Sequence, residues 1–251
     1  MPWSEEYQPQ QSESQKDTRN EIFNKTKKEL DGKFKWVTKF PAEKRSLMIF
    51  GALFETLAIS ENLENLPDTE IQKNTRTLIE ELFQKAPISL GEEWASKPDD
   101  VSVIFDKDGH LVIDKILEMK TSVSALVHGR DKGQSQHSLE TIEKIVKLMN
   151  SMIAAPNIEE VSEITTLGDK HHFRKEYLEK IYRRIKDMGI NEDISLSPSL
   201  QYQIVLPANE TGYIPKIQVM RDGIPIEVVV THSKFSKDDI HSIIDHYQET
   251  P

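Results

Sequence analysis

Apolar residues recur with helical spacing in three segments before residue 90, and this pattern predicts three helices. The first runs from about Asn20 to the Asp31-Gly32 pair. The second opens at Phe40-Pro41, where the proline suits the first turn of a helix. The third runs from about Thr69 to Lys85, and Thr69 or Asp68 is the residue type that caps a helix.

The spacing of apolar residues changes near residue 101, from helical to alternating. Val101, Val103 and Phe105 alternate along a short segment that predicts a strand, and Asp108-Gly109 is a typical hairpin turn. A second strand follows from about His110 to Thr121. The two strands are expected to pair antiparallel, with Phe105 opposite Leu111.

The second half of the chain predicts further helices and strands. A helix starts at Ser138, a second runs from Lys170 to Met188 and ends at Gly189, and a last helix follows Ser236 as its N-cap residue. Strands are expected near 202–206, 216–220 and 226–231. This order of elements predicts an α/β (α+β) fold with a mixed central sheet flanked by helices.

Composition divides the chain into three parts. Residues 1–20 are rich in Gln, Ser and Glu and are expected to form a disordered tail. Residues 21–66 form an N-terminal helical extension, and residues 67–251 the α/β domain. With 251 residues and 37% hydrophobic content, the chain is long enough to bury one good core.

Charge and cysteine content narrow the classes of function. The formal net charge is −10, so no overall positive field attracts nucleic acid, and any such contact needs a local basic patch. The chain has no cysteine, which excludes disulfides and a cysteine nucleophile. The N-terminus lacks a secretory signal, and the longest apolar run, Leu47 to Phe54, is far shorter than the about 20 residues that span a bilayer. A cytoplasmic protein with no membrane partner is expected.

Acidic residues and a lysine are predicted to meet at one end of the hairpin. Counting outward from the turn places Asp99 or Asp100 alongside Glu118 or its neighbour, and Lys120 shares a strand face with Glu118. Two carboxylates can hold a divalent cation, and a lysine beside them can help activate water or stabilise negative charge. Either Asp99 or Asp100 can serve as the first acid.

At these residues the chain resembles the PD-(D/E)XK nuclease superfamily, whose core is restriction-endonuclease-like. Pro98-Asp99 matches the metal-binding aspartate, Glu118 the second acidic ligand and Lys120 the catalytic lysine. The resemblance implies Mg²⁺-dependent phosphodiester hydrolysis of DNA or RNA, with Mn²⁺ as an alternative ion. It also implies an acid on the preceding helix, for which Glu80 and Glu81 are candidates, and a glutamine near the following helix, for which Gln134 and Gln136 are candidates.

A basic segment is the best candidate for contacts with nucleic-acid phosphates. Between Lys170 and Lys186 seven residues are Lys or Arg, and ion pairs between neighbouring helical turns are the competing interpretation. The residues predicted to bind nucleic acid are Lys170, Arg174, Arg183, Arg184 and, from the glycine-containing loop at 128–134, Arg130.

Three functions remain open at this point. The first is a metal-dependent nuclease that uses Asp99 or Asp100, Glu118 and Lys120. The second is a catalytically inactive protein of the same fold that serves as an interaction module for protein or nucleic acid, which suits the acidic surface. The third is a small-molecule enzyme with its site elsewhere, although no nucleophile or dinucleotide motif supports it. The oligomeric state and the choice between DNA and RNA stay open.

Overall fold

The computed structural model describes residues 42–64, 69–85, 98–127, 134–161 and 175–248. The tail at residues 1–20 and the helix expected from Asn20 lie outside the described residues. The chain divides into two compact units, with the division at residues 64/65 and again at 234/235. Helices α2 (Ala42–Glu64) and α8 (Lys237–Gln248) belong to the first unit, and the second contains the elements between them.

In the first unit, α2 and α8 pack against each other through apolar side chains. The rings of Phe50 on α2 and His241 on α8 lie 4.9 Å apart between centroids. The predicted N-cap of α8 is confirmed, because Ser236 Oγ accepts from Asp239 N–H at 3.1 Å and Asp239 Oδ2 accepts from Ser236 N–H at 2.9 Å. No described helix is both long and apolar enough to cross a bilayer.

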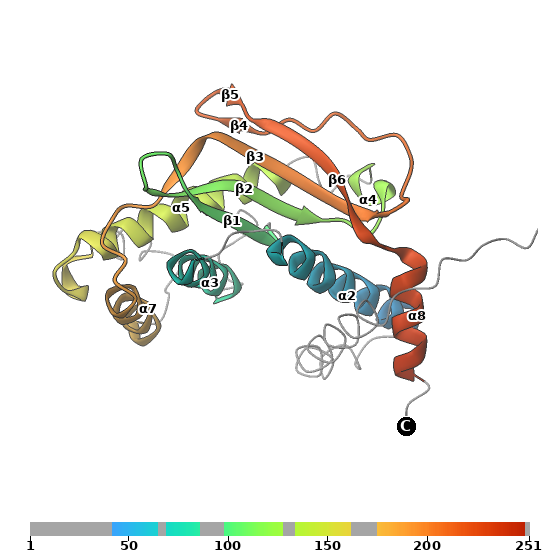
Figure 1. Ribbon diagram of the computed structural model, residues 1–251, viewed down its shortest axis with the longest axis horizontal. Helices are drawn as coiled ribbons and strands as arrows, with labels where there is room; N and C mark the ends of the chain where they lie inside the picture. The colour runs from blue at the N-terminus through green and yellow to red at the C-terminus, as the bar shows by residue number, and fades with distance from the viewer. Residues whose placement is uncertain (1–41, 65–68, 86–97, 128–133, 162–174, 249–251) are drawn as a thin grey trace, which may run out of the picture. The chain divides into compact units, whose positions relative to one another are not determined.

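The second unit is built on a mixed four-stranded sheet (Figure 1). Its strands are β1 (Asp100–Phe105), β2 (Leu111–Met119), β3 (Ser195–Ala208) and β6 (Glu227–Ser236), in the order β1-β2-β3-β6. β1 and β2 are antiparallel, whereas β2 and β3 are parallel. The predicted fold class, a mixed sheet flanked by helices, is therefore confirmed.

The β1–β2 hairpin has the predicted turn and, next to the turn, the predicted register. Phe105 lies opposite Leu111, and Gly109 adopts a φ of 87°, which a residue without a side chain reaches most easily. The Asp106 carboxylate closes the turn by accepting from the N–H groups of Asp108 and His110, each at 2.9 Å. Further along, the register shifts at Asp114, so β2 contains a bulge at this position.

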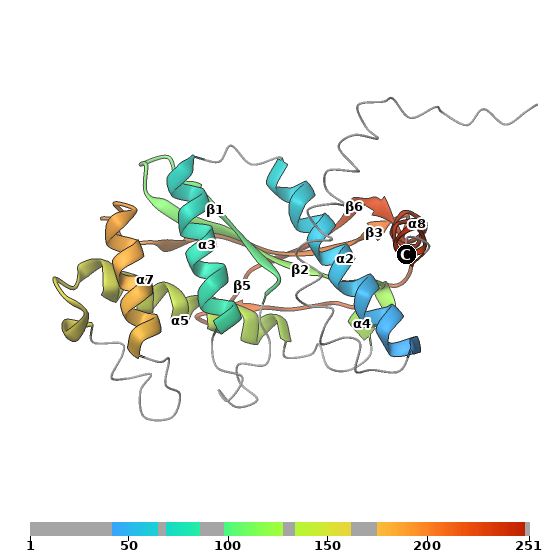
Figure 2. The ribbon, with the colours of Figure 1, turned by 90° about the horizontal axis from the view of Figure 1, so that it is seen from below.

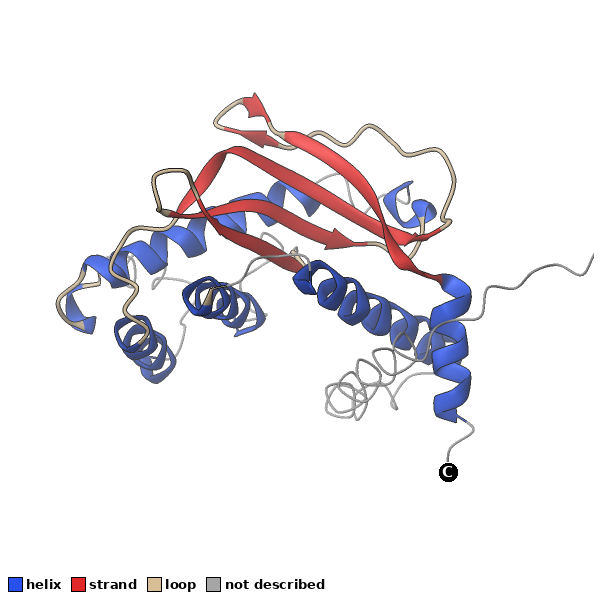
Figure 3. Ribbon diagram, in the orientation of Figure 1, coloured by secondary structure: helices blue, strands red, loops and turns tan. Residues whose placement is uncertain are grey.

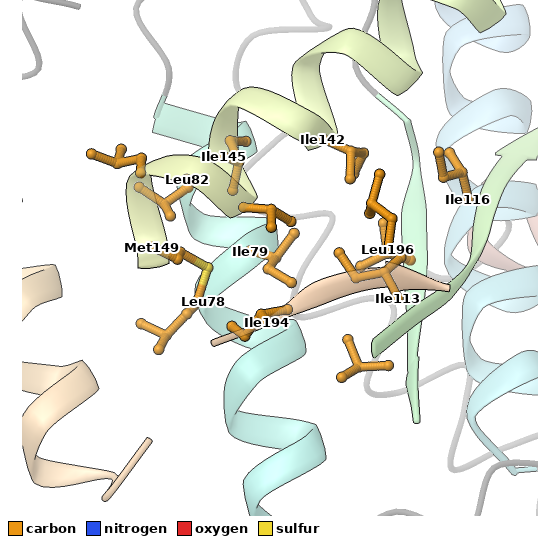
Figure 4. Close-up of a cluster of buried hydrophobic side chains, with 14 of the residues drawn as sticks. Leu78, Ile79, Leu82, Ile113, Ile116, Ile142, Ile145, Met149, Ile194 and Leu196 are labelled. Atoms are coloured by element: carbon orange, nitrogen blue, oxygen red, sulfur yellow. The ribbon is translucent and has the colours of Figure 1, made fainter. Parts of the chain in front are cut away.

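Helices α3 (Glu70–Lys85) and α5 (Gln134–Ala154) pack on this sheet, and α7 (Lys175–Asp187) packs against these two helices (Figure 2). Their apolar side chains form one core with those of the strands, in which Leu78, Ile142 and Ile116 are fully buried (Figure 4). Each such side chain contributes about 1.5–3 kcal/mol by leaving water. The core thereby fixes the helices against the face of β2 that carries Ile116.

Two helix ends differ in how well the sequence predicts them. α7 ends at the predicted glycine: Gly189 has a φ of 67°, and Ile190 N–H donates to Ile185 O at 3.3 Å. α5 begins at Gln134 rather than at the expected Ser138. Its first turn is polar in sequence, so the apolar period starts only at Leu139 and does not reveal it.

The remaining elements are short and connect the larger ones. α4 (Val123–Val127) and the 3₁₀ helix η2 (Ile158–Glu160) follow β2 and α5 respectively. β4 (Met220–Arg221) and β5 (Ile224–Pro225) form a separate two-stranded hairpin (Figure 3). Of the strand expected at 216–220, only the last residue, Met220, lies in a strand.

Helix α3 is fixed at its start and along the edge of the sheet. Thr69 Oγ1 accepts from Gln72 N–H at 3.4 Å, while Gln72 Oε1 accepts from Thr69 N–H at 3.0 Å, so the two residues form a reciprocal cap. The other end of the same amide, Gln72 Nε2, donates to Val103 O of β1 at 3.2 Å. The cap therefore sets the rotation at which α3 meets β1.

We expect Thr69→Ala to lower the free energy of unfolding by about 1 kcal/mol, because it removes the cap that satisfies the first turn of α3. Urea unfolding followed by circular dichroism measures this loss. Thr77→Ala is the matched control, since Thr77 is exposed and mid-helix and donates only to Lys73 O of the preceding turn. An equal loss in both variants would contradict a special role for the cap.

Candidate functional site

Glu118 lies near the end of β2 and is almost fully buried, with 3% of its surface exposed. Its two carboxylate oxygens have different partners. Oε1 lies 2.7 Å from Lys120 Nζ, and Oε2 accepts a hydrogen bond from the Tyr202 hydroxyl at 3.1 Å. Burying an unpaired carboxylate costs free energy, and these two contacts offset that cost for Glu118.

The pleat of the sheet explains why these side chains meet. Glu118 and Lys120 are two residues apart, so they project from the same face, as the sequence predicts. Tyr202 on β3 lies opposite Ile116 on β2, which is two residues before Glu118 on that face. Lys120 N–H donates to Val205 O at 2.9 Å, which extends the β2–β3 ladder and fixes the Lys120 backbone.

Asp99 is attached to the backbone groups on either side of Glu118. Its N–H donates to Leu117 O at 3.0 Å, and its Oδ2 accepts from Met119 N–H at 2.6 Å. The hairpin thus brings Asp99 and Glu118 to the same end of the sheet, although 18 residues separate them in sequence.

Asp100 is held by helix α3. It lies opposite Leu117 in the β1–β2 register and is 1% exposed. Its Oδ1 accepts from Val101 N–H at 2.8 Å and lies 3.2 Å from Arg76 Nε. Arg76 Nε also pairs with Glu80 Oε1 at 2.9 Å, so one guanidinium serves two carboxyl groups.

Burial raises the pKa of Asp100 well above its usual value. The Arg76 guanidinium lowers it in part, and the negative charge of Glu80 raises it again. Asp100 Oδ2 is buried and accepts no hydrogen bond from the residues that the structure describes. The two aspartates that the sequence left as alternatives therefore have distinct surroundings: Asp99 adjoins Glu118, and Asp100 belongs to a carboxyl pair around Arg76.

Of the candidate upstream acids, Glu80 joins Asp100 through Arg76, whereas Glu81 pairs with Arg184 of α7. Gln136 of α5 is engaged elsewhere, because its Oε1 accepts from Met220 N–H at 2.8 Å and its Nε2 donates to Met220 O at 3.0 Å. Gln134 is the first residue of α5.

The basic candidates on α7 are partly used within the protein. Arg184 forms its ion pair with Glu81, whereas the side chain of Arg183 is 75% exposed and lies 3.7 Å from Glu179. Arg183 is therefore the more exposed of the two. Lys170, Arg174 and Arg130 lie outside the described residues.

The acidic residues suit a hard cation by their chemistry. Across the ranges that the structure describes, no three His, Asp or Glu side chains form a ready-made metal centre. Magnesium in proteins needs only one or two carboxylates, with waters and substrate oxygens completing its shell. Asp99 and Glu118 carry oxygen donors of this kind, so their chemistry suits the ion.

Sequence reasoning missed Tyr202 and Arg76, which contact the predicted residues. Tyr202 lies on a strand that the pattern predicts only as apolar, and Arg76 is one charged residue among several on α3. Burial raises the pKa of Tyr202 well above its usual value, as does the charge of Glu118, while the neighbouring hydroxyls of Ser135 and Ser138 lower it in part. Tyr202 therefore keeps its proton and acts as the donor to Glu118.

Comparisons of the chain with protein-family models, with curated proteins and with solved structures return no match. The resemblance to PD-(D/E)XK nucleases therefore stays a prediction from Asp99, Glu118 and Lys120 and from the order of elements around them. The function is therefore inferred from the chemistry of this site.

Asp100 makes a testable contribution to the pH dependence of stability. Because its folded pKa is raised, protonation of Asp100 favours the folded state, and this contribution is lost as pH rises from about 4 through the raised pKa. Asp100→Asn keeps an acceptor for Arg76 without a charge that titrates. We expect the variant to gain stability relative to the wild type between about pH 4 and pH 7 in urea unfolding.

The control variant is Asp106→Asn, because Asp106 contributes to the pH dependence of stability with the opposite sign. Hydrogen bonds from the backbone of His110 and, to a smaller extent, of Asp108 lower the pKa of exposed Asp106, so its contribution is present at neutral pH and lost on acidification. A stability difference between Asp100→Asn and wild type that does not change with pH would refute the interpretation of Asp100.

Proposed function

We propose that this protein is a Mg²⁺-dependent phosphodiester hydrolase, a nuclease that acts on DNA or RNA. The observation that carries the proposal is the buried contact between Glu118 and Lys120, at the end of the hairpin where Asp99 is also attached. An acid pair suited to a divalent cation and a lysine beside it are the groups that this chemistry requires.

Each residue has a defined task in the proposed reaction. Asp99 and Glu118 would hold the ion, and a bound Mg²⁺ lowers the pKa of water and stabilises negative charge on phosphate. The Lys120 side chain is 16% exposed whereas that of Glu118 is 4% exposed, so the lysine is the more accessible of the two. Its ammonium group can therefore orient the attacking water or stabilise charge on a phosphate oxygen.

The second candidate is a catalytically inactive protein of this fold that acts as an interaction module. One observation favours it: both oxygens of Glu118 already have partners within the protein, Lys120 and Tyr202, as in an ion pair that only supports the fold. The net charge of −10 also suits a protein partner better than nucleic acid. We place either activity in the cytoplasm, because a chain without cysteine suits a reducing compartment.

We expect the purified protein to cleave DNA or RNA with Mg²⁺ or Mn²⁺, and Lys120→Ala to reduce the rate by about 10²-fold or more without unfolding the chain. The measurement is cleavage of labelled single- and double-stranded substrates, with and without EDTA. The matched control is Lys115→Ala, because Lys115 lies on the same strand but projects from the other face.

Cleavage by wild type and Lys115→Ala but not by Lys120→Ala would support the nuclease. A wild-type protein that cuts none of these substrates with either ion would overturn the enzymatic proposal and leave the interaction module.

The two aspartates are expected to differ in their effect on metal binding. Asp99→Asn keeps an acceptor for Met119 N–H but removes the charge beside Glu118, so we expect Mg²⁺ affinity to fall by at least about tenfold. Asp100→Asn changes a group paired with Arg76 and should leave the affinity nearly unchanged. Isothermal titration calorimetry with MgCl₂ measures the Mg²⁺ affinity of both variants. A larger loss of affinity in Asp100→Asn than in Asp99→Asn would show that Asp100 is the metal ligand.

A further inference from the structure

The Tyr202 hydroxyl differs from the hydroxyls of Tyr177 and Tyr182 in the group to which it donates a hydrogen bond. Tyr177 and Tyr182 are half-buried and donate to backbone carbonyls, those of Glu81 and Ala155, at 3.0 Å each. Tyr202 is fully buried and donates to a side-chain carboxylate, that of Glu118. A backbone carbonyl already has a fixed orientation, whereas the carboxylate of a glutamate rotates over a broad range about its last bond.

This hydrogen bond defines the orientation of the Glu118 carboxylate. Lys120 lies at Oε1 and Tyr202 at Oε2, so the two donors approach the two oxygens separately. The tyrosine is the stiffer of the two, because its ring has only two rotatable bonds and is enclosed by the core, whereas the lysine stem has four. Tyr202 therefore fixes the plane of the carboxylate even when the lysine moves.

The tyrosine is in turn supported by the start of helix α5. Ser135 and Ser138 are buried at 8% and 0% exposure, and their hydroxyls lower the pKa of Tyr202 in part. Strand β3 and helix α5 thus enclose the phenol oxygen together, with Glu118 as its acceptor. A polar group of this kind inside a core is far more constrained than one on the surface.

We propose that Tyr202 is a positioning residue for divalent-cation binding, which fixes the orientation of the Glu118 carboxylate through its hydrogen bond to Oε2. This inference rests on the proposed function, since it assigns Tyr202 to the same site. Partners that orient a metal ligand typically change metal affinity by about 10–100-fold when they are removed.

The test compares Mg²⁺ affinity in Tyr202→Phe and wild type by isothermal titration calorimetry on the full chain, without nucleic acid. Phenylalanine keeps the ring and its packing and removes only the donor. We expect affinity to fall by about tenfold or more. Tyr182→Phe, which removes a hydroxyl bonded to Ala155 O, is the matched control and should bind Mg²⁺ as the wild type does.

Thermal unfolding in EDTA separates positioning from general destabilisation. If Tyr202→Phe and Tyr182→Phe lose similar stability but only Tyr202→Phe loses affinity, the role of Tyr202 is supported. High Mg²⁺ should also restore cleavage in Tyr202→Phe, whereas it cannot restore it in Lys120→Ala.

A measurement on the unsubstituted protein avoids any effect of substitution on folding. With tyrosines labelled with ¹³C at Cζ, addition of MgCl₂ should shift the Tyr202 signal and leave that of Tyr182 unchanged.

The possible failures are distinguishable. A wild type that binds Mg²⁺, with Tyr202→Phe binding it equally and a Tyr202 signal that stays in place, would overturn the role of Tyr202 alone. A wild type that binds neither Mg²⁺ nor Mn²⁺ would overturn this inference and the proposed metal site together.

Discussion

A carboxylate buried at the end of a central strand is the constraint on which this site depends. Glu118 is removed from water, so the fold must supply partners for both of its oxygens. It does so with one residue from the same strand, Lys120, and one from the neighbouring parallel strand, Tyr202. The parallel β2–β3 pairing is therefore as necessary to the site as the hairpin that carries the acidic residues.

The same requirement is met differently at Asp100. There the compensation comes from helix α3, whose Arg76 contacts Asp100 and Glu80 together. Burial is the main reason that the pKa of Asp100 is raised; the positive charge of Arg76 lowers it in part, and the negative charge of Glu80 raises it again. Asp99 and Asp100 are adjacent in the chain but contact different groups, the N–H of Met119 and the guanidinium of Arg76 respectively.

The sequence predicts the elements of this site better than the contacts within it. Alternation and the Asp108-Gly109 turn were enough to place Phe105 opposite Leu111, and from there Asp99 beside the segment that holds Glu118. Local rules succeed as far as Val103 opposite Ile113, because the turn determines the register of the strands that it joins. Beyond that pair the bulge shifts the register by one residue, so Asp100 lies opposite Leu117 and not opposite Ile116.

Contacts made by distant segments were not predictable in the same way. Tyr202 and Glu118 are 84 residues apart in sequence, and they meet only because β2 and β3 pair in parallel. A single sequence contains no signal for the register of that pairing. The bulge at Asp114 and the polar first turn of α5 were missed for a related reason: both depend on packing, not on periodicity. The action of Asp99, Glu118 and Lys120 on a phosphodiester stays a prediction.

Two glutamine side chains have a consequence for how this protein meets its neighbours. A strand at the margin of a sheet exposes backbone groups that can recruit a strand from another molecule and so begin aggregation. Gln72 donates its amide to Val103 O on β1, and Gln136 bonds both the N–H and the C=O of Met220 on β4. Each amide occupies backbone groups that a strand of another molecule would use: one carbonyl on β1, at the margin of the four-stranded sheet, and both polar groups of Met220 in the separate β4–β5 hairpin. At these positions the side chain therefore hinders edge-to-edge pairing.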